Sequence, residues 1–286
     1  MPQLIRERLA ARAGLWSGVF STSFGVSAAV GAGITLPLVA ASSLPLALAA
    51  WTLPIVLLTG IALAVARRAS SRRSHTDAPG PRLRLERTPL LWQVTGFFGC
   101  QALVFFATTA WLPTIYADRG LPPDRAAGLL ALASIAGLPA ALGISLLASR
   151  LRRQHLLVAI TSAGSAVGLA GVGWAPVALA PIFVAVLGFA QGSAFGLAIA
   201  LVVLKADPAR PMAPFSAFAQ GVGYAIAAAG PLLLGLLRSY GEPWSVAISI
   251  LLAVVVAQAV SGWAAGRTVV TRPAESGTQP VTVGNR

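Results

Sequence analysis

Three apolar stretches of the sequence each contain a glutamine that stands four residues before an aromatic ring. The pairs are Gln101 with Phe105, Gln191 with Phe195, and Gln220 with Tyr224. On a helix, a spacing of four residues places the amide and the ring on the same face, one turn apart. An amide offers hydrogen-bond donors and an acceptor, and a ring offers an apolar wall with a positive edge. We therefore predict that the three pairs line one substrate-binding pocket for a small polar or planar delocalised solute.

The alternative is that each glutamine forms a hydrogen bond across a helix interface. Such bonds stabilise membrane proteins by only about 0.6 to 2 kcal/mol each, and the sequence leaves the two interpretations open. Gln258 lies in the last apolar stretch and has no aromatic residue four positions later. It provides the comparison for the other three glutamines.

Glycine recurs every four residues beside Gln191, at Gly188, Gly192 and Gly196. Small residues at this spacing let the backbones of neighbouring helices approach closely. We expect this stripe to be a packing face.

The apolar stretches hold no side chain suited to covalent or metal chemistry. They contain no Asp, Glu, Lys or Arg, and we expect both His75 and His155 in cytoplasmic loops. Ionisable groups inside a membrane are costly and usually functional, so their absence argues against an enzyme. Cys100 is the one cysteine of the sequence and is best explained as a small packing residue. We expect no catalytic residue, no metal site and no cofactor.

The composition excludes an ordinary soluble protein. Of the 286 residues, 56% are hydrophobic and 10% are charged, whereas a soluble domain carries about 25% charged residues. Every charged residue falls outside six uncharged stretches, which are residues 13–66, 88–117, 126–149, 154–204, 211–237 and 243–266.

The lengths of these stretches predict the number of helices. A helix of about 20 residues spans the hydrocarbon core of a bilayer, so the first and fourth stretches are each long enough for two. Both have turn-forming residues near their centres, at residues 37–45 and 171–176. The sequence therefore predicts an all-α polytopic membrane protein with eight transmembrane helices.

The basic residues predict how these helices are oriented. Assigning alternate loops to opposite sides of the membrane places 18 of the 21 Lys and Arg residues, among them Lys205, on one side and 3 on the other. Basic loops stay in the cytoplasm, so we expect both termini there. The same distribution explains the net charge of +13 without any binding of nucleic acid.

The chain divides into four parts along its length. Residues 1–66 contain the first two predicted helices, at about 13–39 and 45–66. Residues 67–89 form a basic linker with seven arginines, which we expect to be flexible and cytoplasmic. Residues 90–266 contain the other six helices, and residues 267–286 form a polar tail that we expect to be disordered.

Three runs of the sequence resemble a known family. Residues 101–113, 188–204 and 219–231 are similar to helices seven, ten and eleven of the cyanate and nitroimidazole permease branch of the major facilitator superfamily. The resemblance implies twelve helices in two halves of six, joined by a long basic loop like residues 67–87. On that pattern the eight helices correspond to helices five to twelve, so the chain resembles a family member truncated at its N-terminus.

The resemblance also implies a function. We expect a secondary transporter, or a fragment of one, in the bacterial cytoplasmic membrane, which moves a small polar or anionic solute such as cyanate by alternating access. Its partners would be the solute, the lipid bilayer and a separate N-terminal half. The alternative is a remnant or scaffold protein that transports nothing.

Overall fold

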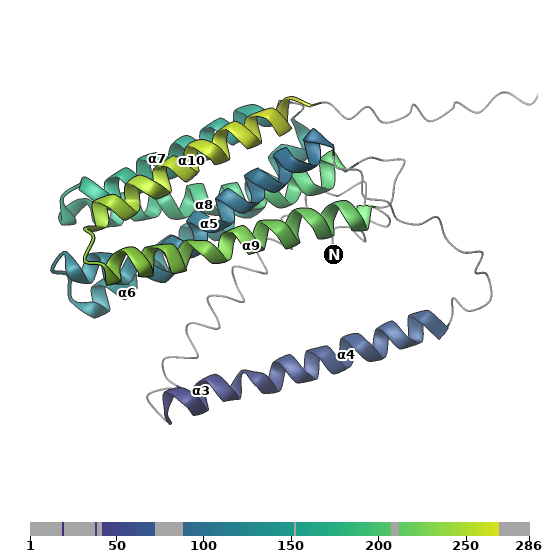
Figure 1. The fold of residues 1–286 in the computed structure, drawn as a ribbon, viewed down its shortest axis with the longest axis horizontal. Helices are drawn as coiled ribbons and strands as arrows, with labels where there is room; N and C mark the ends of the chain where they lie inside the picture. The colour runs from purple at the N-terminus through teal and green to yellow at the C-terminus, as the bar shows by residue number, and fades with distance from the viewer. Residues whose placement is uncertain are drawn as a thin grey trace, which may run out of the picture.

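The protein is all-helical in the part of the chain that the computed structural model describes, which is residues 19, 38, 42–71, 88–151, 153–206 and 212–268. Figure 1 shows the arrangement of the helices. In chain order they are α3 (Leu44–Ala50), α4 (Thr52–Ser71), α5 (Pro89–Asp118), α6 (Pro123–Arg150), α7 (Gln154–Trp174), the short 3₁₀ helix η2 (Val177–Leu179), α8 (Ala180–Lys205), α9 (Met212–Ser239) and α10 (Trp244–Arg267).

Six of the eight predicted membrane helices are present as long helices. The spans α5, α6, α7, η2 with α8, α9 and α10 are each long and apolar enough to cross a membrane. The break predicted inside the stretch 154–204 lies between Trp174 and Ala180, where η2 joins α7 to α8. Thr88 caps the start of α5 by accepting a hydrogen bond from the backbone N–H of Leu91.

The N-terminal helices differ from the prediction, and the count of eight is not confirmed. The first predicted helix, at about 13–39, lies outside the described residues except for two isolated positions. In place of the second are α3 and α4, separated at Trp51. Pro54 explains the break, because a proline inside a helix cannot donate to the carbonyl four residues earlier and its ring clashes with that carbonyl.

The apolar part of α4 is also short. Residues Thr52–Ile61 form an apolar helix shorter than a membrane span. The helix then continues to Ser71, five residues beyond the predicted end at residue 66. Arginine is a good helix former, and Arg67 and Arg68 prolong the helix into the predicted linker.

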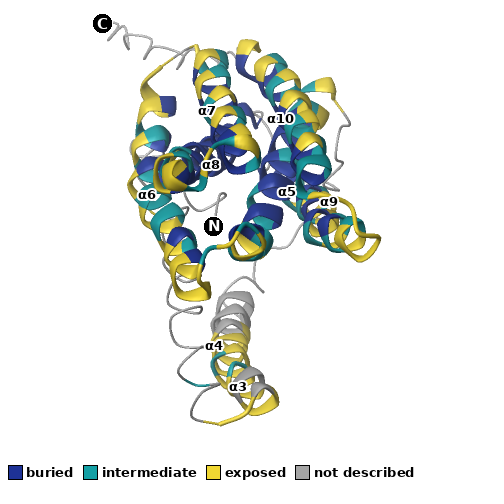
Figure 2. Ribbon diagram, turned by 90° about the vertical axis from the view of Figure 1, so that its left-hand side faces the viewer, coloured by how far each residue is buried: buried dark blue, intermediate teal, exposed yellow. Residues whose placement is uncertain are grey.

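Helices α5 to α10 form one bundle, with α8 at its centre. In the most apolar segment of α8, 83% of the segment is buried inside the protein, whereas the buried share of the corresponding segments of α6 and α9 is 28% and 22%. Helices α5, α6 and α7 pack against α8, α9 packs against α5, and α10 packs against α5 and α7. Figures 1 and 2 show α3 and α4 apart from this bundle, and their described apolar side chains, such as Leu53 and Val56, are exposed.

The charged residues of the bundle lie at the ends of its helices. Arg238 donates to Asp118 over 2.6 Å, and the indole N–H of Trp244 donates to the same carboxylate over 3.0 Å. This contact joins the ends of α5, α9 and α10. The Arg119 guanidinium donates to the backbone oxygens of Val172 and Ala175 at the end of α7, where carbonyls lack partners within their helix.

Two residues predicted in loops belong to helices. Lys205 is the last residue of α8, is 5% exposed, and donates from Nζ to the backbone oxygen of Thr268 just after α10. Lysines commonly satisfy free carbonyls at helix C-termini in this way. His155 is the second residue of α7, and its ring lies edge-on to Trp263.

The glycine stripe is a packing face, as predicted. A Cβ atom at Gly192 would lie 2.2 Å from the backbone oxygen of Gly137 on α6. Gly188 and Gly196 meet Ala133 and Ala141 of α6 in the same way. The residues of the two helices meet in the same order, so α6 and α8 run parallel and touch backbone to backbone.

The close contact between α6 and α8 predicts that replacing glycine with alanine affects thermal stability differently at Gly192 and at Gly143. We expect Gly192→Ala to lower the melting temperature of the purified protein by several degrees, because the new methyl group overlaps the backbone of α6. Gly143→Ala on α6 is the control, since nothing lies within 4 Å of its missing Cβ. Alanine favours a helix over glycine by about 1 kcal/mol, so this variant should melt at the same or a higher temperature. Equal melting temperatures for both variants would contradict the close approach.

Candidate functional site

Two of the predicted glutamines are buried without hydrogen-bond partners. Gln101 on α5 is 0% exposed and Gln191 on α8 is 3% exposed. Neither the nitrogen nor the oxygen of either amide has a partner among the residues that the structure describes. An unsatisfied buried polar group costs about 1–3 kcal/mol, and hydrocarbon offers no compensating partner. These amides are therefore available to a bound solute.

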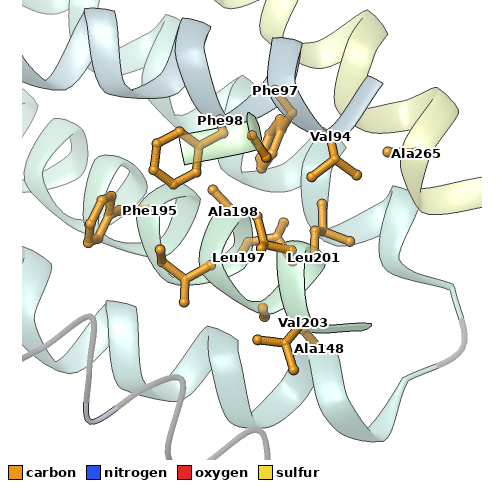
Figure 3. Packing of buried hydrophobic residues seen from close by; sticks show 14 of the residues in the cluster. Val94, Phe97, Phe98, Ala148, Phe195, Leu197, Ala198, Leu201, Val203 and Ala265 are labelled. Carbon is orange, nitrogen blue, oxygen red and sulfur yellow. The ribbon is translucent and has the colours of Figure 1, made fainter. Parts of the chain in front are cut away.

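The rings that follow these two glutamines meet each other. The centroids of Phe105 on α5 and Phe195 on α8 are 6.2 Å apart, and their planes differ by 21°. Helices α5 and α8 therefore bring two of the three predicted pairs to one place. Figure 3 shows Phe195 beside the neighbouring α5 residue Phe98, at one side of the hydrophobic core.

The third predicted ring, Tyr224 on α9, joins the same group through two further phenylalanines. Phe98 contacts Tyr224 at a centroid distance of 5.1 Å and Phe195 at 6.4 Å. Phe106 contacts Tyr224 at 6.4 Å and Phe105 at 5.5 Å. The five rings form a closed series of contacts, which we call the aromatic circuit. Gln101 lies on the α5 face that carries Phe98 and Phe105, one turn from each.

Sequence reasoning missed Phe98 and Phe106 as members of this circuit. Phe98 stands three residues before Gln101, a spacing that also places it on the same helix face. That signal was present in the sequence. The contact of Phe106 with Tyr224 depends on how α9 packs against α5, and nothing in the spacing within α5 indicates it.

Gln220 differs from the other two predicted glutamines. It is half-buried, and its amide nitrogen donates to the hydroxyl of Ser216, one turn earlier on α9, over 2.7 Å. The structure thus places its neighbour Tyr224 in the aromatic circuit and gives Gln220 itself a partner on its own helix. That bond must open if the Gln220 amide nitrogen is to turn toward a solute.

Gln258 behaves as a packing residue. It is 0% exposed, and its amide nitrogen donates to the hydroxyl of Ser162 on α7 over 3.3 Å. The bond joins α10 to α7, which is the interhelical role that the alternative interpretation assigns to every glutamine. Gln101 and Gln191 have no such bond among the described residues.

The groups at this site are suited to binding a solute. Two amides and five rings provide hydrogen bonds and apolar contact, and nucleophile–base pairs of the kind used in covalent catalysis are not among them. In the described residues no group of three His, Cys, Asp or Glu side chains could hold a metal ion.

Comparison with known proteins gives a family match and several relatives. The chain matches the sequence profile of the Major Facilitator Superfamily over residues 2–231. The 2-nitroimidazole transporter of Escherichia coli (strain K12) is 29% identical over 280 residues, which cover 93% of this chain and 68% of that protein. The cyanate transport protein CynX of the same organism is 31% identical over 241 residues, covering 84% of this chain and 62% of that protein.

A third relative is an uncharacterized transporter of Bacillus subtilis (strain 168), YycB. It is 28% identical over 274 residues, which cover 93% of this chain and 67% of that protein. The chain thus spans about two thirds of the length of these relatives. No solved structure matches it.

Among the described residues, Gln101 and Gln191 have unpaired amides, whereas the amide nitrogen of Gln258 is hydrogen-bonded. Replacing each of them with an apolar side chain should therefore shift the melting temperature in different directions. Methionine resembles glutamine in length and is fully apolar, so Gln101→Met and Gln191→Met each remove an unsatisfied amide. We expect both variants to melt at a temperature equal to or above that of the unsubstituted protein in the absence of solute. Gln258→Met is the matched control and should melt lower, because it leaves the hydroxyl of Ser162 without its donor. A shift of all three variants in the same direction would contradict the assignment.

Proposed function

Since the chain belongs to the major facilitator superfamily, in the branch of the cyanate and nitroimidazole transporters, we propose that it is a secondary transporter or part of one. The solute is small and polar or anionic, as cyanate is, and crosses a bacterial cytoplasmic membrane by alternating access. The observation that supports this most is the pair of buried, unsatisfied amides of Gln101 and Gln191 beside the aromatic circuit.

The free energy of the two amides explains why such a site binds a solute. The described part of the protein itself provides no hydrogen-bond partner for the two amides. A solute with hydrogen-bonding groups provides these partners, so its binding removes the unfavourable free energy of the unpaired amides. The rings exclude water from the solute, which strengthens these hydrogen bonds in a medium of low dielectric constant. In this proposal Gln101, Phe105, Gln191 and Phe195 bind first, and Gln220 and Tyr224 complete the site from α9.

The bundle serves as the C-terminal half of the transporter in this proposal. Residues 90–266 supply six helices, residues 1–66 belong to the N-terminal half, and residues 67–89 link them. Its helices α6 and α9 keep most of their apolar surface exposed. These faces suit contact with lipid or with the other half, which a separate chain would complete.

The charges at the two ends of the bundle support the proposed orientation. One end carries the basic residues Arg150, Arg153, Lys205 and Arg267 and no acidic residue among those described. The opposite end carries Asp118, Arg119, Asp124, Arg125, Arg238 and Glu242. Over the full sequence, 18 of the 21 Lys and Arg residues fall on the side of the first end. Since basic residues accumulate in the cytoplasm, in this proposal the first end and both termini face the cytoplasm.

Uptake measurements with two glutamine variants test the proposal. We expect Gln220→Ala to abolish uptake of radiolabelled cyanate into bacterial cells that express the protein, while its level in the membrane stays nearly unchanged. The level is preserved because the lost hydrogen bond contributes only about 1 kcal/mol. Gln258→Ala is the control and should retain uptake, because Gln258 packs α10 against α7.

Two results would contradict the proposal. The first is that cells expressing the unsubstituted protein take up no more cyanate than cells without it. The second is that the Gln220 and Gln258 variants lose uptake to the same degree at equal membrane levels, which would assign every glutamine to helix packing.

A further inference from the structure

We infer that the outer surface of α7 and α10 binds an anionic phospholipid, whose phosphate contacts Arg153 and Arg267 and whose acyl chains lie along both helices. The inference goes beyond the proposed transport function and does not depend on the transported solute. Three observations carry it: an exposed apolar stripe on each helix, an arginine at the same end of each stripe, and the lack of acidic partners for both arginines among the described residues.

Helices α7 and α10 lie side by side and run in opposite directions (Figure 1). At the basic end of the bundle, a Cβ atom at Gly266 of α10 would lie 2.5 Å from the backbone nitrogen of His155 on α7. Further along the pair, Gln258 of α10 bonds to Ser162 of α7. The contacting positions rise in number on α7 as they fall on α10, so the helices are antiparallel. On their inner sides, α7 packs against α8 and α10 packs against α5.

Each of these two helices carries one stripe of exposed residues on its outer side. The members of a stripe are spaced alternately three and four residues apart, a spacing that places them on one helix face. Ile160 on α7 is 68% exposed and Val260 on α10 is 66% exposed. At the basic end, the stripes consist of Arg153, Leu156, Ile160 and Ala163 for α7, and of Val256, Val260, Trp263 and Arg267 for α10.

The depth of these stripes matches the acyl chains of one leaflet. Ten residues separate Arg153 from Ala163, which corresponds to about 15 Å of helix and to half the thickness of the hydrocarbon core. Trp263 stands one turn before Arg267 on the same stripe. Tryptophan concentrates at the level of the lipid headgroups, so the two arginines lie at the level of the phosphates and the apolar residues lie beside the acyl chains.

Both arginines are available to an external anion. The described residues at this end of the bundle include no acidic residue, and neither Arg153 nor Arg267 forms an ion pair with another described residue. Lys205, a third cation at this end, already donates to the backbone oxygen of Thr268. Arginine forms paired hydrogen bonds with phosphate oxygens, and basic residues between membrane helices bind anionic headgroups in this way.

Competition between phosphatidylglycerol and phosphatidylethanolamine with identical acyl chains tests the inference. Both lipids have a phosphate, but the ammonium group of the ethanolamine lipid cancels its charge and is repelled by the arginines. Each basic residue near an anionic lipid surface strengthens attachment about five-fold, so two arginines predict a preference of about 25-fold for phosphatidylglycerol. Native mass spectrometry of the full chain, in detergent with equal amounts of both lipids, measures the ratio of the two one-lipid complexes.

Single arginine variants assign this preference to the proposed residues. Arg153→Gln and Arg267→Gln should each lower the preference about five-fold. Arg125→Gln is the matched control, because Arg125 is an exposed arginine at the opposite end of the bundle, and it should leave the preference unchanged. The melting temperature of each variant in the same detergent shows whether it is folded.

Four results would overturn the inference. The first is equal binding of both lipids by the unsubstituted chain. The second is a preference that survives both stripe variants, or that Arg125→Gln lowers as much as they do. The third is displacement of phosphatidylglycerol by excess glycerol 3-phosphate, which has a phosphate without acyl chains and would indicate a simple anion site. The fourth is a dimer that binds neither lipid, which would assign the exposed stripes to a second copy of the chain.

Discussion

The cost of an unpaired amide in a membrane interior is the constraint on which the rest of this structure depends. Several other polar side chains deep in the described bundle form hydrogen bonds: Gln258 bonds to Ser162, Ser145 bonds to the backbone of α6 and α8, and Trp111 donates to the carbonyl of Pro231. Gln101 and Gln191 do not. In the proposed transporter, the solute supplies the missing hydrogen bonds.

Glycine packing makes this arrangement possible. Because Gly188, Gly192 and Gly196 let α8 press against the backbone of α6, α8 occupies the centre of the bundle with neighbours on three sides. Gln191 and Phe195 stand three residues after Gly188 and Gly192, so they lie beside the stripe, on the side of α8 that meets α5. The aromatic circuit fills this space between α5, α8 and α9, and isolates the two amides from lipid and water.

Much of the bundle is predictable from the sequence, because charges and turn residues mark the ends of its helices. The spacing of four residues correctly places Phe105, Phe195 and Tyr224 in one group of contacts. The N-terminal region is less predictable, since the break before Pro54 depends on a local clash within an apolar stretch. The contact of Phe106 with Tyr224 does not follow from spacing, because it depends on how α9 packs against α5.

Nuclear magnetic resonance of glutamine side chains tests most directly whether the two amides hold the solute. The protein is labelled with ¹⁵N at glutamine, placed in nanodiscs and titrated with cyanate, and single Gln→Met variants assign the signals. We predict that the titration shifts the side-chain resonances of both Gln101 and Gln191, while that of Gln258 stays in place. If cyanate moves neither Gln101 nor Gln191, or if Gln258 shifts as far as they do, the two amides do not form the proposed binding site.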